Sequence, residues 1–282
     1  MQVSTVSDPE EFMANAGDLL YRHPVHNNVL LFHAVDPAGL PPGTGQPVFA
    51  WVTDPGGTVV GAAFAMVPYR MTLSEMPVQA ARALADHFAE HESWLPGASG
   101  PDDTASAFAA RWSEITGQPA RREREQWLMR CDETTRQAPP PGRPRLATAA
   151  DLDAVAEWFS ATMRHSGLDK EKALRHTRHM AEGQLAGKRL IVWEGEDGKP
   201  LGAAGWAPPI GGVVRPSGVF VAPEARDGGY ATALLGEVTA RALEEGADTC
   251  VCTHYLAYAS MLAVVEKVGY QRVMDLTEYR FG

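Results

Sequence analysis

A strand-like run that passes through a proline and two adjacent glycines into a helix-like run is the feature that most restricts this fold. Residues 219–221 are apolar and rich in strand-forming side chains, and Pro223 follows them after Ala222. Gly228 and Gly229 then precede a helical pattern that begins at about Tyr230. Glycine reaches backbone angles closed to other residues, and a helix leaves its first N–H groups without intrahelical partners. The segment therefore predicts a strand, a loop and a helix that can accept an anion such as phosphate.

Two neighbouring residues favour this interpretation of the turn. Arg226 can add charge-assisted hydrogen bonds to an anion, and Ala231 leaves room for a ligand to approach the backbone. An ordinary helix start that binds nothing is the alternative. A dinucleotide site of the Rossmann type fits less well, because the Gly-x-Gly-x-x-Gly pattern and repeated βαβ units are both absent.

A proline-rich segment divides the chain into two parts. Residues 138–144 contain four prolines, which favour an extended connector and exclude a continuous helix. With 282 residues and 45% apolar content, each part is large enough to bury its own core. We therefore predict domains at residues 1–137 and 145–282, joined by a linker at 138–144.

The two parts are predicted to share one order of elements in an α+β fold. In the second part, helices are expected at residues 152–167, 170–184, 229–245 and 260–268, and strands at 189–193, 201–206, 213–221, 249–254 and 272–281. In the first part, helices are expected at 8–21, 27–34, 77–91 and 102–115, and strands at 48–53, 59–67, near Met71 and at 126–131. The first part has no counterpart of the glycine pair, because residues 74–80 contain no glycine.

Charge and composition exclude several classes of protein. The net charge of −10 argues against a nucleic-acid or anionic-membrane partner, and no apolar run approaches the length of a membrane span. Three cysteines and the lack of a signal-like N-terminus predict a reduced, cytoplasmic protein. His176 and His179 share a helical face, but no carboxylate or cysteine completes a ligand set, so no metal site is predicted.

The pattern Arg226-x-x-Gly229-x-Ala231, with its preceding strand and Pro223-Glu224, resembles the pyrophosphate-binding motif of the GCN5-related N-acetyltransferase (GNAT) family. The order of elements over residues 144–282 also matches that family. The whole chain is similar to two-domain forms whose first half is a degenerate GNAT-like domain. The resemblance implies two tandem GNAT-like domains, each a mixed, mostly antiparallel twisted sheet flanked by helices.

The same resemblance implies one coenzyme A site per chain. Acyl-CoA, most simply acetyl-CoA, would be the co-substrate, and it would lie between two strands that splay apart. The residues expected to bind it are Val219, Phe220, Val221, Arg226, Asp227, Gly228, Gly229, Tyr230, Ala231 and Thr232. Asp227 departs from the family, which usually has glycine or a basic residue there, and a carboxylate beside a pyrophosphate weakens binding unless it points to solvent.

The catalytic groups are less well marked. Alignment through Gly269 and Tyr270 puts Val265 where the family often carries a tyrosine general acid, and valine cannot donate a proton. Tyr255 and Tyr258 are the remaining candidates for the acid. His254 has a suitable intrinsic pKa for the base, although a strand-end histidine with a structural role is equally compatible with the pattern.

Two further side chains are candidates for the chemistry. Glu194 is an alternative base, although such a position is more often a turn residue. Cys252 could accept an acyl group, although strand cysteines are usually small buried hydrophobic residues.

Two functions follow from these residues. The first is an acyl-CoA-dependent transfer to the amine of a small molecule, by a monomer or homodimer. The second is a sensor or scaffold that binds acyl-CoA without catalysis.

Overall fold

The protein is described by a computed structural model, which covers residues 1–36, 45–91, 95–135, 137–163 and 169–282. The chain forms two compact units. Unit 1 comprises residues 1–128, 255–257 and 274–282, and unit 2 comprises residues 129–254 and 258–273. The chain therefore returns to unit 1 at its C-terminus, and the predicted domain limits at 137 and 145 stay a prediction.

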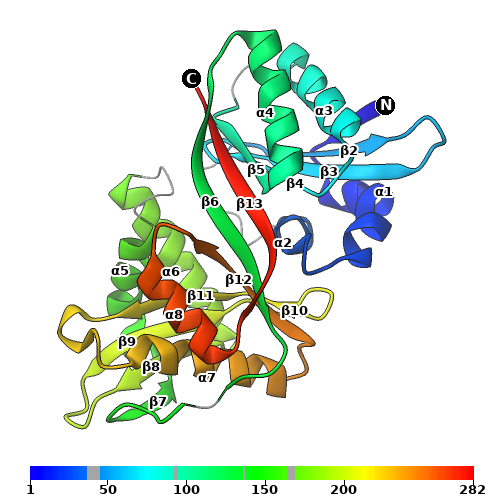
Figure 1. The fold of residues 1–282 in the computed structure, drawn as a ribbon. Coiled ribbons are helices and arrows are strands. Elements are labelled where there is room, and N and C mark those ends of the chain that lie inside the picture. Colours follow the sequence, from blue (N-terminus) through cyan, green and yellow to red (C-terminus); the bar gives the residue numbers. More distant parts are fainter. Residues whose placement is uncertain (37–44, 92–94, 136, 164–168) are drawn as a thin grey trace. The chain divides into compact units, whose positions relative to one another are not determined.

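Unit 1 is a sheet covered by helices on both faces. Its strands are β1 (Gln2–Val6), β2 (Val48–Thr53), β3 (Val59–Ala65), β4 (Met71–Leu73), β5 (Gly97–Pro101), the first part of β6 (Ala120–Cys131) and the last part of β13 (Gln271–Phe281). Their order is β1-β2-β3-β4-β5-β13-β6. Helices α1 (Pro9–Arg22) and α2 (Asn28–Val35) lie on one face, and α3 (Val78–His91) and α4 (Asp102–Thr116) lie on the other (Figure 1).

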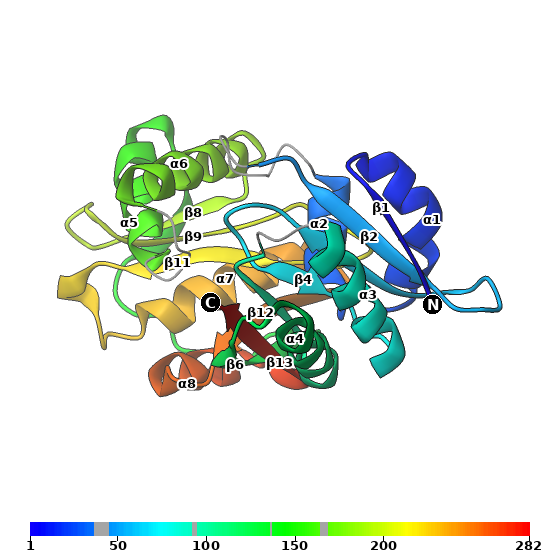
Figure 2. The same cartoon turned by 90° about the horizontal axis from the view of Figure 1, so that it is seen from above.

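Unit 2 contains a four-stranded sheet in the order β11-β9-β8-β7. The strands are β7 (Arg143–Leu146), β8 (Leu190–Glu194), β9 (Pro200–Trp206) and β11 (Pro216–Val221), and all of their pairings are antiparallel. Helices α5 (Leu152–Thr162) and α6 (Lys170–Ala186) cover one face, and α7 (Tyr230–Glu244) covers the other (Figure 2). The remaining elements are β10 (Val213–Val214), β12 (Thr249–Tyr255) and α8 (Ala259–Val268).

The two units follow one order of elements. A strand, two helices, three strands, a helix, a strand, a helix and a long strand follow each other from β1 to β6 and again from β7 to β13, if β10 and β11 are counted together. This order confirms the predicted α+β class. The strands β1, β5 and β7 were not expected from the sequence, because β1 and β7 are short and β5 is rich in glycine.

Local sequence explains the helix boundaries. The Asp8 carboxylate accepts a hydrogen bond from the Glu10 N–H at the start of α1, and Pro9 has a backbone angle suited to a first helical turn. Helix α8 ends at Gly269, whose φ of 115° lies in the left-handed region, as the sequence predicts. Helix α5 buries an apolar stripe that consists of Val155, Ala156 and Phe159.

The expected strand at 213–221 is in fact two strands in different sheets. Val213 and Val214 pair with β12 in parallel, whereas Pro216–Val221 pairs with β9 antiparallel. The change of partner comes at Arg215 and Pro216, and proline is tolerated there because it stands at the first position of a strand. Among the described residues, no helix has the length and apolar character needed to cross a membrane.

Candidate functional site

Among the described residues, β11 and β12 do not pair with each other, and we call this break in strand pairing the gap beside β11. Val213 and Val214 hydrogen-bond alongside Thr249 and Cys250, but the chain then crosses to β9 and diverges from β12. Strand β11 is the edge of its sheet, so in the described part of the chain no strand pairs with its outer side. The backbone groups on that side can accept an extended ligand in the manner of a further strand.

A bulge in β11 was not foreseen from the sequence. The register against β9 shifts between Ser217 and Phe220, and Gly218 has a φ of 66°. A Cβ at Gly218 would lie 2.5 Å from the Phe159 ring, so only glycine fits here. Bulges redirect backbone groups and are frequent beside active sites. The signal available in the sequence was a single glycine inside a strand-like run.

The loop before α7, which we call the glycine loop, comprises residues 226–231. Gly229 is the residue before the helix, with a φ of 85°, and having no side chain it provides no side-chain cap. A Cβ on Gly228 would come within 2.8 Å of the Tyr230 ring, whereas one on Gly229 would meet nothing within 4 Å. The start of α7 is therefore exposed at Gly228 and Gly229 and has no side-chain cap, which is an arrangement suited to binding phosphate.

Two charged side chains flank this opening. Arg226 and Asp227 are both exposed, and Asp227 has a φ of 62°, which is unusual for a residue other than glycine. Aspartate tolerates this region better than most residues, because its short side chain can bond locally.

The predicted ligand-contacting residues of β11 are half-buried. Phe220 stacks on Trp158 of α5 with 5.4 Å between ring centroids, so it belongs to the helical layer on that face. Strand alternation directs Val219 and Val221 to the opposite face, which α7 covers. At the start of α7, the Tyr230 ring packs edge-on against Trp193, with centroids 6.1 Å apart.

On β12, Cys250, Cys252 and His254 point to one side by alternation. The Cys250 thiol lies 3.9 Å from the carbonyl oxygen of Thr239, which identifies this side as the one facing α7. Burial lowers the pKa of His254, with Glu266 opposing the shift, so this imidazole is neutral at pH 7. A neutral histidine can accept a proton.

The thiol of Cys252 is unsuited to accept an acyl group. Burial raises its pKa to about 12, and Arg215 opposes that shift only in part. The thiolate is the nucleophilic form, so Cys252 is unreactive at neutral pH.

The two tyrosine candidates lie in different surroundings. Tyr258 precedes α8 and is 44% exposed, and its carbonyl oxygen accepts hydrogen bonds from Met261 and Leu262. Tyr255 ends β12 and belongs to unit 1, where its hydroxyl donates to Glu278 at 3.3 Å. Burial and Glu278 raise the pKa of Tyr255, so it keeps its proton at neutral pH.

Glu194 is not brought to the gap beside β11. It ends β8, and β9 separates β8 from β11. Its carboxylate bonds to Arg145 at 2.7 Å and Arg143 at 3.1 Å, and these arginines lower its pKa. Arg145 in turn binds Asp151, whose pKa falls to about 2, so Glu194 is part of an ion-pair network that stabilises the start of α5.

Two absences bear on the chemistry. Val265 is buried and carries no titratable group, so the position expected to hold an acid cannot supply one. Among the described residues, no group of three or more histidine, cysteine, aspartate or glutamate side chains could hold a metal ion.

The family of the second half is decided by a comparison with known protein families. Residues 152–270 match the model of the acetyltransferase (GNAT) family. This segment is a GNAT domain. The glycine loop, β11, β12 and α8 all lie within these matched residues.

Solved structures similar to this one extend the likeness to the whole chain. An acetyltransferase of the GNAT family from Colwellia psychrerythraea covers 100% of both chains at 12% identity, with a TM-score of 0.61. A tandem GNAT protein from the clavulanic acid biosynthesis pathway covers 100% of this chain and 98% of its own at 13% identity and a TM-score of 0.63. A GNAT protein from Sphaerobacter thermophilus covers 99% and 95% at 16% identity and the same score.

Because the sequence identities to these solved structures are only 12–16%, the structural similarity shows that the fold is shared and nothing more. It confirms two tandem GNAT-like domains, and it agrees with the repeated order of elements in the two units. A search of curated proteins found no match to this chain.

Proposed function

We propose that the protein is an N-acyltransferase that moves the acetyl group of acetyl-CoA to the amine of a small molecule. The glycine loop carries this proposal. It joins β11, whose outer side pairs with no strand among the described residues, to a helix that has no side-chain cap, within a segment that matches the acetyltransferase family. The coenzyme's pyrophosphate would bind at Gly228 and Gly229, with Arg226, Tyr230, Ala231 and Thr232 beside it.

The pantetheine arm would run along Val219, Phe220 and Val221, because the outer side of β11 offers backbone donors and acceptors to its amides. Near the bulge at Gly218, an N–H aimed at the thioester oxygen would stabilise the negative charge that develops there. The neutral amine attacks the thioester carbonyl carbon, the C–S bond breaks, and CoA leaves as a thiolate.

We assign the base to His254 and the acid to Tyr258, because the Tyr255 hydroxyl is already bound to Glu278 in unit 1. His254 is neutral at pH 7 and takes the proton that the attacking amine loses. A tyrosine hydroxyl protonates the departing thiolate, although a thiol with an ordinary pKa of about 8.5 leaves without much help. We do not assign Glu194 as the base, because two arginines bind its carboxylate.

Release of free thiol tests the activity. The protein is incubated with acetyl-CoA and a panel of small primary amines, and the thiol is measured with a chromogenic disulfide. We expect release above the rate without amine for at least one amine class. CoA binding without any release would contradict catalysis.

The role of His254 has its own test. His254→Gln should lower kcat by about 100-fold with little change in the Kd for CoA, because a general base contributes to the chemical step. Since its pKa is lowered, wild-type kcat should hold as the pH falls through 6.5 and decline only below it. His91→Gln on α3 is the matched control, and equal loss in both variants would overturn the assignment.

An acyl-CoA sensor or scaffold is the second candidate, and buried Val265 favours it. This function predicts CoA binding without turnover, together with a CoA-dependent change in oligomeric state or partner binding. Light scattering with and without CoA, beside the thiol assay, distinguishes the two functions. As an enzyme we expect a monomer or homodimer in the cytoplasm, where its three free cysteines stay reduced, with neither nucleic acid nor membrane as a partner.

A further inference from the structure

Arg215 lies at the start of the gap beside β11. Val214 pairs with Cys250 of β12, and from Pro216 onward the chain pairs with β9 instead. Arg215 therefore stands between the two pairings. Its charge opposes the rise in the pKa of Cys252, which follows Cys250 by two residues on β12. The guanidinium thus lies near the place where β11 and β12 begin to separate.

The electrostatic surroundings of Arg215 differ from those of Arg145, which also belongs to unit 2. The carboxylates of Asp151 and Glu194 raise the pKa of Arg145. Burial lowers the pKa of Arg215, and Cys252 opposes that shift only in part, so the loss of water outweighs the charges around this guanidinium. Arginine nevertheless keeps its charge at neutral pH. A substrate anion beside Arg215 would compensate for the hydration that burial removes.

A hydroxyl group follows Arg215 on the same side of the extended chain. Alternation directs Arg215 and Ser217 to one side. The side-chain amide of Gln184, a residue that is 6% exposed, donates to the Ser217 hydroxyl oxygen at 2.7 Å. Because the Ser217 oxygen accepts this bond, its own O–H can donate to a ligand oxygen. A cation and a hydroxyl donor on one side of the chain are a combination that suits a carboxylate.

His254, the proposed base, lies farther along β12. By alternation it points to the same side as Cys252, and alternate residues of a strand are about 7 Å apart. An amine that loses its proton to His254 and a carboxylate bound by Arg215 would therefore be only a few bonds apart in one substrate.

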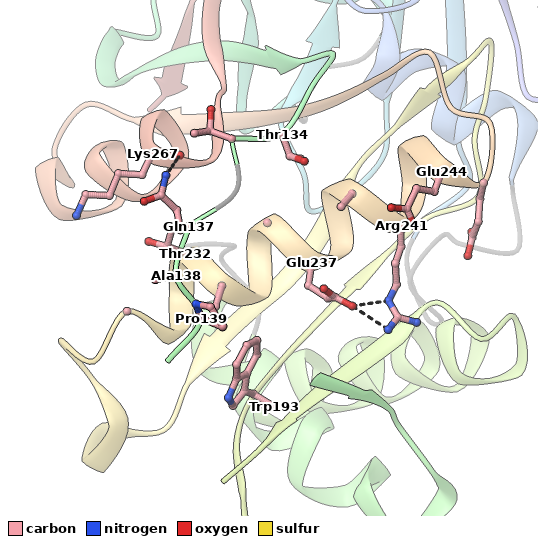
Figure 3. A pocket seen from close by; sticks show the side chains of 16 residues that line it. Thr134, Gln137, Ala138, Pro139, Trp193, Thr232, Glu237, Arg241, Glu244 and Lys267 are labelled. Carbon is pink, nitrogen blue, oxygen red and sulfur yellow. Dashed lines mark hydrogen bonds and ion pairs between the residues drawn. The ribbon is translucent and has the colours of Figure 1, made fainter. Parts of the chain in front are cut away.

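A groove of about 730 Å³ along the outer side of α7, also within unit 2, is less suited to an anion (Figure 3). The wall opposite α7 is one segment, which we call the connector: Thr134, Thr135, Gln137, Ala138 and Pro139. The described lining has three glutamates and two cations: Glu237, Glu244, Glu245, Arg241 and Lys267. Glu237 already holds Arg241 at 2.8 Å. A substrate carboxylate is therefore better accommodated at Arg215.

We propose that the acceptor is an amine that also carries a carboxylate within a few bonds of its nitrogen, as an amino acid does, and that Arg215 binds this carboxylate with Ser217 beside it. The inference rests on the proposed function, which supplies acetyl-CoA as donor and His254 as base. The carboxylate takes no part in the bonds that change: the N–C bond forms, the C–S bond breaks, and the carboxylate is recovered in the product. Arg215 is thereby a residue that determines which amine is acetylated.

The test compares acceptors in matched pairs, each an amino acid beside the amine that lacks only its carboxyl group. The pairs are glycine with methylamine, β-alanine with ethylamine, γ-aminobutyrate with propylamine, leucine with isopentylamine, and phenylalanine with phenethylamine. Thiol release from acetyl-CoA by the full-length protein gives kcat/KM for each acceptor. We expect the amino acid to exceed its amine by about tenfold or more in at least one pair.

Amines that equal or exceed their amino acids in every pair would overturn the carboxylate site and leave the proposed function intact. Thiol release with none of the acceptors would instead overturn the proposed function, and this inference with it.

Variants of Arg215 test the residue itself. Arg215→Gln should lower kcat/KM for the preferred amino acid by about 30-fold or more, mainly through a higher KM, and change that for the paired amine by less than about threefold. Arg215→Lys should keep part of the activity, because it keeps the charge without the planar fork. Arg241→Gln on α7 is the matched control and should change neither acceptor, because Glu237 already holds that guanidinium.

The Kd for CoA, measured by titration calorimetry, should be unchanged in all three variants, which shows that they are folded. Equal loss for the amino acid and its amine in Arg215→Gln would overturn the role in specificity, because the damage would then extend to the whole site.

A substrate carboxylate can also belong to the acyl group, and succinyl-CoA provides that comparison. With the plain amines we expect succinyl-CoA to be no better a donor than acetyl-CoA. A preference for succinyl-CoA that Arg215→Gln abolishes would overturn the proposal, because it would place the carboxylate on the donor.

Discussion

The turns that precede α3 in unit 1 and α7 in unit 2 occupy the same place in the repeated order of elements. They differ in how much space the neighbouring side chains leave beside them. In unit 1 the turn is closed: Ser74 accepts a hydrogen bond from the Ala62 N–H at 2.9 Å, and the Met76 N–H donates to Thr104 at 3.3 Å. The Met76 side chain is packed so closely on Gly61 that a Cβ there would lie 2.8 Å from it. In unit 2 the glycine loop is open.

The strands before these two turns differ in their pairing with neighbouring strands. Strand β4 is paired on both sides, antiparallel to β3 and parallel to β5. In the part of the chain that the structure describes, strand β11 is paired on one side only, because the chain leaves β12 after Val214. One fold can therefore hold an open turn or a filled one, and the difference rests on two glycines, one bulge and the change of strand partner.

The largest effect is expected from blocking the open turn. Gly229→Trp places a bulky side chain in front of the first N–H groups of α7 and strains a residue whose φ is 85°, so we expect at least about 100-fold weaker CoA binding. Val78→Trp makes the corresponding change at the exposed start of α3 and should leave CoA binding unchanged. Calorimetric titration measures both. Loss of binding in Val78→Trp alone would reverse the assignment of the two turns.

Removing the Met76 side chain from the turn before α3 should lower the stability of the protein without creating a CoA site. Met76 is buried, so Met76→Ala should lower the free energy of unfolding by about 2–4 kcal/mol through the cavity it leaves. CoA stoichiometry should remain one per chain, because the backbone of this turn is already hydrogen-bonded. Urea denaturation and calorimetry provide the two measurements, and a second CoA per chain would contradict our explanation.

The first long helices of the two units provide a smaller contrast. Asp8 caps α1 on the surface, whereas buried Asp151 before α5 binds Arg145 and the Thr148 N–H and hydroxyl. The pKa of Asp151 is lowered to about 2, so its carboxylate stabilises the fold above pH 4 and that contribution disappears as the pH falls toward 2.

Asp151→Asn should therefore lower the free energy of unfolding by about 2 kcal/mol at pH 7, and the difference from wild type should shrink as the pH falls toward 2. Asp8→Asn, the control, should change it by less than about 0.5 kcal/mol, because asparagine caps helices equally well. Urea denaturation at several pH values checks both. A pH-independent loss in Asp151→Asn would indicate packing rather than charge.

The smallest effect is expected at Asp227, where the glycine loop departs from its family. Asp227→Gly removes a carboxylate near the pyrophosphate and suits a φ of 62°, so we expect about threefold tighter CoA binding at low salt. Asp227→Asn separates charge from backbone, because it keeps the side-chain size. An affinity that neither variant changes would mean that this carboxylate points to solvent when CoA is bound.

The sequence alone was sufficient for the parts of this protein that depend on neighbouring residues. Alternation and helical spacing predict most strands and helices, and Gly228, Gly229 and Arg226 predict an anion-binding turn. These features are local. The start of a helix is marked by capping residues and glycines close to it in the sequence, and an amphipathic stripe is marked by the spacing of apolar residues within one helix. The short strands β1 and β7 were missed because so few residues give a weak pattern.

Strand pairing and contacts between segments that are distant in the sequence were decided by the tertiary structure. No local pattern revealed that residues 213–221 divide between two sheets, that Phe159 packs against Gly218, or that two arginines bind Glu194. The groove between α7 and the connector likewise depends on bonds from residues 135 and 137 to the end of α8. Sequence specified the elements and the glycine loop, whereas long-range pairing and burial decided which of them form a site, because those energies depend on partners distant along the chain.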